Sequence, residues 1–118
     1  MKKNLLIIGA GGVAQVVAHK AAMHNDIFGE ISLASRTLSK CEAIAQSVAD
    51  KGSMKVAGKI HCYALDALDI EATAALIRST RSEIVINVGS AFLNMSVLSA
   101  CIETGAAYID TAIHEDPN

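Results

Sequence analysis

The sequence predicts an α/β fold, in which a doubly wound parallel sheet of five strands carries helices on both faces. Short apolar runs alternate with longer amphipathic segments along the 118-residue chain, and this alternation is typical of strands joined by crossover helices. Hydrophobic residues make up 52% of the chain but aromatic residues only 3%, which suits close packing of helices on a sheet. With helices on both faces, the expected strand order is 3-2-1-4-5.

The first strand and the first helix follow directly from the spacing of apolar residues. Leu5–Ile8 is an uninterrupted apolar run that ends at a glycine, as expected of a strand buried on both faces. Residues 12–24 are predicted to form a helix. Val13, Val17 and Ala21 recur at every fourth position and are expected on its inner face.

The rest of the chain repeats this arrangement. Further strands are predicted at residues 31–34, 59–65 and 84–88, and a fifth begins at Tyr108-Ile109. Helices are predicted at residues 38–51 and 69–79, and from Asn94, the expected cap, to about Gly105. Gly52 is the expected stop of the second helix. The inner faces of the second and third helices should carry Leu38, Cys41, Ala45, Val48, Ile70, Ala74 and Ile77.

A glycine-rich turn follows the first strand. The run Gly9-Ala10-Gly11-Gly12-Val13-Ala14 matches G-x-G-x-x-A between a strand and a helix, the fingerprint of a Rossmann-type nucleotide fold. Gly9 permits the tight turn, Gly11 lets the backbone approach a pyrophosphate, and Ala14 lets the helix pack closely. The amide groups at the helix start, from Gly12 and Val13 onward, would face the phosphates. A glycine turn without a ligand is the alternative, but this placement favours a cofactor.

The end of the second strand favours NADP(H) over NAD(H). An NAD-binding domain carries an Asp or Glu there, which accepts hydrogen bonds from the adenosine ribose. This chain has Ala34-Ser35-Arg36-Thr37 instead. Arg36 can pair with a 2′-phosphate, Ser35 and Thr37 can donate hydroxyl hydrogen bonds, and Lys40 can add charge one helical turn later. The alternative is a solvated Arg36, with Thr37 or Ser39 serving only as a helix cap.

Four further residues are candidates for cofactor contacts. Asp66 follows the third strand and could contact the adenine edge, or could serve only in a turn. Gly89 ends the fourth strand, where such folds pass the cofactor towards the nicotinamide. Val88 and Ser90 are expected to line the ribose and ring beside it. A glycine that simply eases a turn is the alternative for this position.

Catalytic and metal-binding residues are not predicted within this chain. The four histidines lack the spacing of metal ligands. His19 and His24 are expected at the surface and His61 in a strand, whereas His114 is the only one expected near the cofactor cleft. The sequence shows neither a nucleophile–base pair nor a carboxylate dyad.

Composition excludes several other functions. A net charge of −2 and the lack of a basic cluster argue against a nucleic-acid partner. Three scattered cysteines are too few for a disulfide framework and fit a reducing cytoplasm. The apolar start is interrupted by glycines and polar residues, so it is neither a signal peptide nor a membrane span.

Several stretches together are similar to the saccharopine dehydrogenase (reductase) family. They are Leu5–Ala14, Ala34-Ser35-Arg36-Thr37, Leu65-Asp66 and Ile84–Val88. The final stretch, Tyr108–Pro117, is most similar to the branch of this family that makes carboxynorspermidine. The resemblance covers the whole chain.

The resemblance implies an enzyme that uses NADPH to reduce an imine. In the polyamine branch this imine forms between aspartate β-semialdehyde and a diamine, and its reduction gives carboxynorspermidine or carboxyspermidine. A substrate-binding and dimerising domain follows the nucleotide domain in this family. Residues 1–118 are therefore expected to be the NADP-binding part of a larger homodimeric enzyme, with the amino-acid and diamine substrates bound elsewhere and this part inactive alone.

Alternative functions differ from this one in their substrate or in the residues that they require. A saccharopine reductase of lysine metabolism differs only in substrate and remains open. A non-catalytic nucleotide sensor or a methyltransferase would be expected to carry an acidic residue after the second strand. A short-chain dehydrogenase needs a lysine four residues after its catalytic tyrosine, and neither Tyr63 nor Tyr108 has one.

Overall fold

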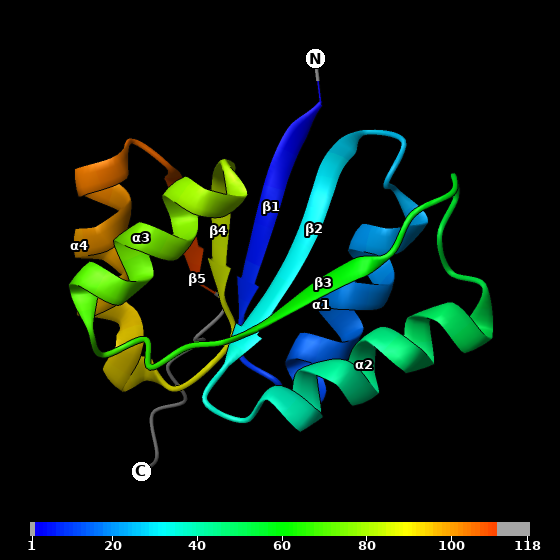
Figure 1. Ribbon diagram of the computed structural model, residues 1–118, viewed down its shortest axis with the longest axis horizontal. Coiled ribbons are helices and arrows are strands. Elements are labelled where there is room, and N and C mark those ends of the chain that lie inside the picture. Colours follow the sequence, from blue (N-terminus) through cyan, green and yellow to red (C-terminus); the bar gives the residue numbers. More distant parts are fainter. Residues whose placement is uncertain (1, 111–118) are drawn as a thin grey trace, which may run out of the picture.

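The computed structural model describes residues 2–110 and has the predicted architecture (Figure 1). Its five parallel strands are β1 (Lys3–Ile8), β2 (Phe28–Ser35), β3 (Ile60–Ala64), β4 (Ser82–Asn87) and β5 (Ala107–Asp110). Its helices are α1 (Gly12–Met23), α2 (Leu38–Lys51), α3 (Ile70–Thr80), the short 3₁₀ helix η1 (Ala91–Leu93) and α4 (Asn94–Thr104). The sheet order is β3-β2-β1-β4-β5, so the predicted order 3-2-1-4-5 is confirmed.

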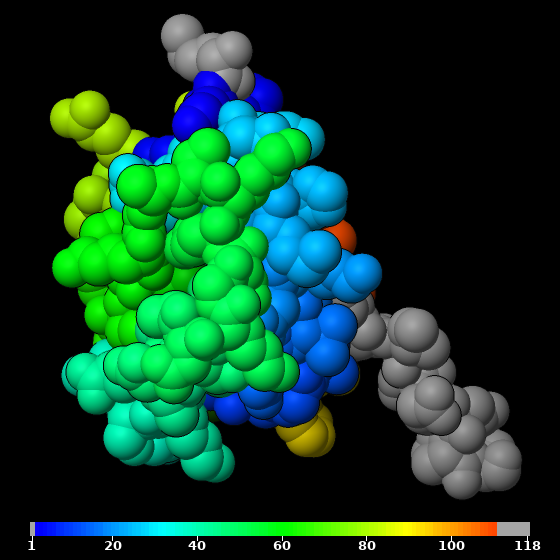
Figure 2. Space-filling view, turned by 90° about the vertical axis from the view of Figure 1, so that its right-hand side faces the viewer, coloured from blue at the N-terminus to red at the C-terminus, as the bar shows by residue number. Residues whose placement is uncertain are grey.

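Strand β1 lies at the centre of the sheet and is buried on both faces. Leu5 and Ile7 belong to the core cluster that holds α1 and α2, whereas Leu6 and Ile8 belong to the cluster that holds α3 and α4. This alternation follows from the two-residue period of a strand. Figure 1 shows the two helical layers on opposite faces of the sheet. Figure 2 shows the side of the molecule that α2 and the segment after it cover, next to α1.

The strand register brings three strand ends together. Ile8, the last residue of β1, lies beside Ala34 of β2 and Asn87 of β4. In Figure 1 the arrowheads of these strands meet at one edge of the sheet. The loops that follow β1, β2 and β4 therefore start side by side, which is where open α/β sheets bind their ligands.

The inner face of α1 differs from the prediction. Its buried residues are four alanines, Ala14, Ala18, Ala21 and Ala22. Val13, predicted to face inward, is 54% exposed, and Val17 is half-buried. Small side chains on the inner face let this helix lie close to the sheet, and the valines are left to the sides.

Two more residues predicted to face inward are exposed. Leu38 and Ile70, in the first turns of α2 and α3, each keep 38% exposure. The buried stripes begin one turn later, and they consist of Cys41, Ile44 and Val48 in α2 and of Thr73, Ala74 and Ile77 in α3. Asp69 precedes α3, and its side chain accepts a hydrogen bond from the Ala72 amide. The second and fourth helices end at the predicted glycines, Gly52 and Gly105.

The predicted cap of the fourth helix is wrong. Asn94 is the first residue of α4 rather than its cap. Its Oδ1 accepts hydrogen bonds from Asn87 Nδ2 at 2.8 Å and from the Tyr108 hydroxyl at 3.1 Å. The Ser90 side chain caps the preceding η1, since it accepts from the Phe92 amide, and α4 itself has no side-chain cap. Asn94 thus joins α4 to β4 and β5, since its two partners lie in those strands.

Residues 2–110 contain neither a membrane-spanning helix nor a cluster of metal ligands. None of the helices in this range has the length and apolar character that a membrane crossing requires. Nor does this range contain a group of three His, Cys, Asp or Glu side chains placed to hold a metal ion.

His19, expected at the surface, is half-buried and bonds to Ser53 and Ser47, because the segment after α2 lies against α1. His114 lies outside the described residues.

Candidate functional site

The turn after β1 requires glycine at its first position. Gly9 has a φ of +128°, a conformation that side chains rarely adopt. A Cβ there would lie 3.0 Å from the Gly89 nitrogen and from two carbon atoms of Val88. The Gly9 amide donates to the Ala34 carbonyl at 2.8 Å. The turn is therefore held between the ends of β2 and β4.

Gly11 and Gly12 have the opposite environment. A Cβ at either position would meet no protein atom within 4 Å, so packing within the described chain does not require glycine there. Gly11 takes the cap position of α1 without any side chain to cap it. The first hydrogen bond of the helix runs from the Gln15 amide to the Gly11 carbonyl, which leaves the preceding helix amides directed outward. This open space before a helix N-terminus fits a pyrophosphate.

The loop after β2 is organised by one serine hydroxyl. Ser35 Oγ donates to the Thr37 carbonyl at 3.0 Å and accepts from the Thr37 amide at 3.2 Å. Cys41 donates its thiol hydrogen to the same oxygen at 3.3 Å. Arg36 stands exposed at the tip of this loop. Thr37 takes the cap position of α2, as in the alternative considered for it, but its side chain makes no capping hydrogen bond.

A pocket of about 260 Å³ joins the two predicted motifs. The turn after β1 contributes Gly9, Ala10 and Gly11, the end of β2 and the loop after it contribute Ser35, Arg36 and Thr37, and the first turn of α2 contributes Lys40. The described residues that line it include two cations and no carboxylate, so the pocket favours an anionic ligand. Sequence motifs separated by about 25 residues thus lie in one site, because β1 and β2 are neighbours and end together.

The apolar wall of this pocket was not predicted from the sequence. Ile8, Leu65, Ala67 and Leu93 complete the lining. They come from β1, from the segment after β3 and from η1. The sequence alone does not show whether an apolar residue at a strand end lines a pocket or belongs to the core. Only the observation that β3 and β4 end near the same edge could have suggested them.

The remaining candidates lie around this edge in different situations. Asp66 is not in the pocket lining, and its Oδ1 accepts from the Leu68 amide at 3.1 Å, as in the turn role considered for it. The Gly89 amide donates to Asn87 Oδ1 at 3.0 Å. The Val88 amide donates to the Ile8 carbonyl at 2.9 Å. Val88 and Gly89 therefore lie against the Gly9 turn, followed by Ser90.

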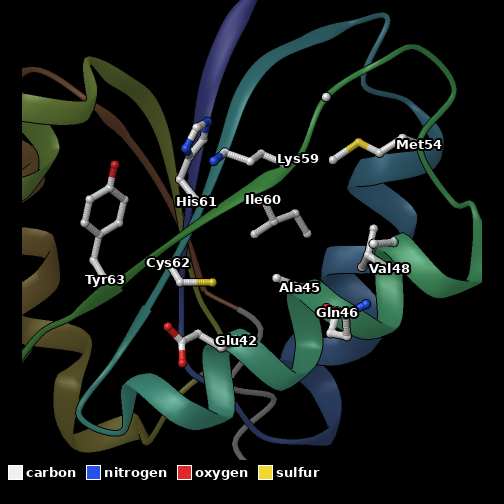
Figure 3. Close-up of a pocket in the computed structure, with 12 residues that line it drawn as sticks. Glu42, Ala45, Gln46, Val48, Met54, Lys59, Ile60, His61, Cys62 and Tyr63 are labelled. Atoms are coloured by element: carbon white, nitrogen blue, oxygen red, sulfur yellow. The ribbon is translucent and has the colours of Figure 1, made fainter.

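A larger pocket, of about 620 Å³, lies elsewhere, between α2 and β3. Figure 3 shows Glu42 at one part of it and Lys59 at another, with Ile60 and Val48 between the strand and the helix. It shares no lining residue with the pocket at the glycine turn. None of the residues predicted to bind the cofactor line this larger pocket.

Sequence relatives point to one group of enzymes. The chain is 43% identical over 113 residues to carboxynorspermidine synthase of Vibrio alginolyticus, covering 95% of this chain and 27% of that protein. It is 41% identical over 115 residues to carboxyaminopropylagmatine dehydrogenase of Synechocystis sp., covering 98% of this chain and 27% of that protein. The chain thus spans about a quarter of the length of these relatives.

A solved structure and a family model agree with these relatives. Apo saccharopine dehydrogenase (L-Glu forming) from Saccharomyces cerevisiae has a TM-score of 0.71 and 26% identity, covering 92% of this chain and 21% of that one. The model of the saccharopine dehydrogenase NADP-binding domain matches residues 5–118. The chain therefore belongs to the saccharopine dehydrogenase NADP-binding domain family, and its cofactor is NADP.

Proposed function

We propose that this chain is the cofactor domain of an NADPH-dependent reductase that acts on the carbon–nitrogen double bond of an imine formed from aspartate β-semialdehyde and a diamine. The product would be carboxynorspermidine or carboxyspermidine. The observation that carries this proposal is the identity above 40% to relatives named for carboxynorspermidine and carboxyaminopropylagmatine, over at least 95% of the chain. Reduction of this imine would make the full-length protein an oxidoreductase of the CH–NH class.

The glycine turn is proposed to hold the pyrophosphate. The open space in front of Gly11 and Gly12 admits the phosphates up to the backbone, and the first amides of α1, from Gly12 to Ala14, donate to them. The helix dipole adds a partial positive charge at the same end. No side chain is needed for this contact, which agrees with the lack of a side-chain cap on α1.

Arg36 and Lys40 are proposed to bind the 2′-phosphate. Both line the pocket beside the turn, and a charge-assisted contact of this kind contributes about 1.5–3 kcal/mol. Thr37 can add a hydroxyl donor. Ser35 acts differently from the expectation, because its hydroxyl hydrogen is already donated to the Thr37 carbonyl. It shapes the loop instead of meeting the phosphate.

The segment after β4 is proposed to guide the nicotinamide half. Val88, Gly89 and Ser90 follow the strand next to β1 and so continue the line from the glycine turn. When bound, NADPH supplies a hydride from its nicotinamide ring, and the protein supplies orientation for it. Substrate binding and homodimer formation are proposed to rest on the part of the relatives' length that this chain does not span. Asp66 is proposed to contact the adenine edge.

A saccharopine reductase is the second candidate. The yeast saccharopine dehydrogenase structure favours it through the fold and 26% identity. The curated relatives above 40% identity favour the polyamine branch. The two candidates share the cofactor site described here and differ only in substrate.

An assay of the full-length protein that contains this domain tests the proposal. NADPH oxidation is followed by absorbance with aspartate β-semialdehyde and either diaminopropane, putrescine or agmatine, with each amine alone as the control. Oxidation that needs both reactants, with a product of the mass of the reduced imine, supports the polyamine reductase. Oxidation of saccharopine with NADP⁺, and no turnover of the diamine mixtures, would favour the second candidate.

A further inference from the structure

A buried thiol lies directly beneath the loop that carries Arg36. Cys41 belongs to the first turns of α2 and has no exposed surface. Its Sγ donates to Ser35 Oγ at 3.3 Å, and Ser35 is only six residues earlier. The thiol hydrogen is thus directed from the core cluster between α2 and the sheet towards the end of β2.

Ser35 links the residues on the two sides of Arg36. Its hydroxyl bonds to both the amide and the carbonyl of Thr37, so the two residues flanking Arg36 are tied to each other. The Thr37 carbonyl also accepts from the Lys40 and Cys41 amides, at 3.1 and 3.5 Å. A short network therefore fixes the backbone on either side of Arg36 and attaches it to the helix that carries Lys40.

We propose that Cys41 is a positioning residue that strengthens the preference of this site for NADP(H) over NAD(H), by orienting the Ser35 hydroxyl that holds the Arg36 loop. The inference rests on the proposed contact between Arg36 and the 2′-phosphate. Cys41 would not touch the cofactor itself. Only the part of the affinity that depends on the 2′-phosphate should need it, because NADH lacks that group.

The environment of the thiol keeps it able to donate. Burial raises the pKa of Cys41, although the hydrogen bond to Ser35 lowers it in part, and the nearby Glu42 carboxylate raises it further. The protonated form is the only one with a hydrogen to donate to Ser35. A second thiol, Cys62 of β3, is packed against the same cluster, and Figure 3 shows its sulfur directed from the strand towards α2. Cys62 makes no hydrogen bond to the loop among the described residues.

The test compares Kd values for NADPH and NADH in matched variants of the purified protein, measured by titration calorimetry. Cys41→Ala removes the donor, and Cys41→Ser keeps one. Cys101→Ala is the control, since Cys101 is equally buried but lies in the cluster on the opposite face. We expect Cys41→Ala to lower the NADPH preference about threefold to tenfold. Cys41→Ser should retain most of it, and Cys101→Ala should leave it unchanged.

The ratio of the two Kd values separates a positioning role from general destabilisation, because partial unfolding lowers the apparent affinity for NADPH and for NADH by the same factor. In the Arg36→Ala background, Cys41→Ala should cause no further loss of preference, as expected for two residues that act through one contact. An unchanged ratio in Cys41→Ala, with a clear loss in Arg36→Ala, overturns this inference alone. An unchanged ratio in Arg36→Ala overturns the proposed role of Arg36 and this inference with it.

Discussion

The Gly9 amide donates to the Ala34 carbonyl at 2.8 Å and thereby joins the turn after β1 to the end of β2. Ala34 lies two residues before Arg36. The part of the site proposed for the pyrophosphate and the part proposed for the 2′-phosphate are thus fixed to each other by a backbone hydrogen bond.

Replacing Gly9 with alanine should disrupt both the fold and the site. The positive φ is strained for alanine, and the new Cβ would lie 3.0 Å from backbone atoms of Val88 and Gly89. We expect Gly9→Ala to lower the free energy of unfolding by about 2–4 kcal/mol, measured by urea denaturation. Gly52→Ala is the matched control, because Gly52 also has positive φ but open space around it. A smaller effect for Gly9→Ala than for Gly52→Ala would contradict the close approach described here.

Replacing Gly11 with alanine should separate binding from folding. Its added Cβ meets no protein atom within 4 Å, and its φ of −90° suits any residue. We expect the thermal midpoint of Gly11→Ala to stay within a few degrees of the parent, while the Kd for NADPH rises by roughly tenfold or more, a loss of at least about 1.4 kcal/mol. If NADPH binds this variant as tightly as the parent protein, the pyrophosphate does not approach the backbone at Gly11.

Several features of the fold were predicted correctly from the sequence. The strand order, the bounds of α2 and the tight turn at Gly9 follow from periodicity, glycine stops and a motif in its proper context. The inner face of α1 could not be predicted from periodicity, because this helix has apolar residues on several sides. The choice of alanines over Val13 depends on how closely the helix lies on the sheet.

Asn94 shows a second limit of sequence reasoning. An asparagine before an amphipathic segment is a good helix cap, yet its partners here are Asn87 and Tyr108, in two separate strands. The predicted sheet order places these two strands side by side, but it does not indicate which of their side chains meet Asn94. The same limit applies to the Cys41–Ser35 hydrogen bond and to the apolar wall formed by Leu65 and Leu93.

Removing the Asn94 side chain should lower the stability of the fold, because two hydrogen-bond donors lose their acceptor. The Asn87 side chain is 1% exposed. Asn94→Ala therefore leaves the Asn87 Nδ2 group buried without its acceptor, and it also removes the acceptor of the Tyr108 hydroxyl. We expect a loss of about 1–3 kcal/mol in the free energy of unfolding. Met95→Ala is the neighbouring control, because Met95 is largely exposed and its replacement should change stability by less than about 0.5 kcal/mol. Equal effects of the two substitutions would exclude the proposed link between α4 and the strands.

Stability should fall as the pH rises from about 9 to about 11. Burial raises the pKa of the Cys101 thiol from 9.0 to about 11, so between these values the unfolded chain has lost a proton that the folded chain keeps. Because the unfolded state binds fewer protons, stability decreases with pH in this window. Thermal midpoints measured from pH 8 to pH 11 should decline, and the decline should be shallower in Cys101→Ala. Parallel curves for the two proteins would show that Cys101 does not contribute.

The role of Arg36 is the central claim, and calorimetric titration of the protein and of Arg36→Ala with NADPH and NADH tests it most directly. Arg36 lines the pocket beside the glycine turn, and the described lining residues include no carboxylate to oppose a 2′-phosphate. The account predicts tighter binding of NADPH than of NADH, and a loss of that preference by roughly ten- to a hundredfold in Arg36→Ala with little change for NADH. Equal affinities in the unaltered protein, or a preference for NADPH that survives in Arg36→Ala, would contradict it.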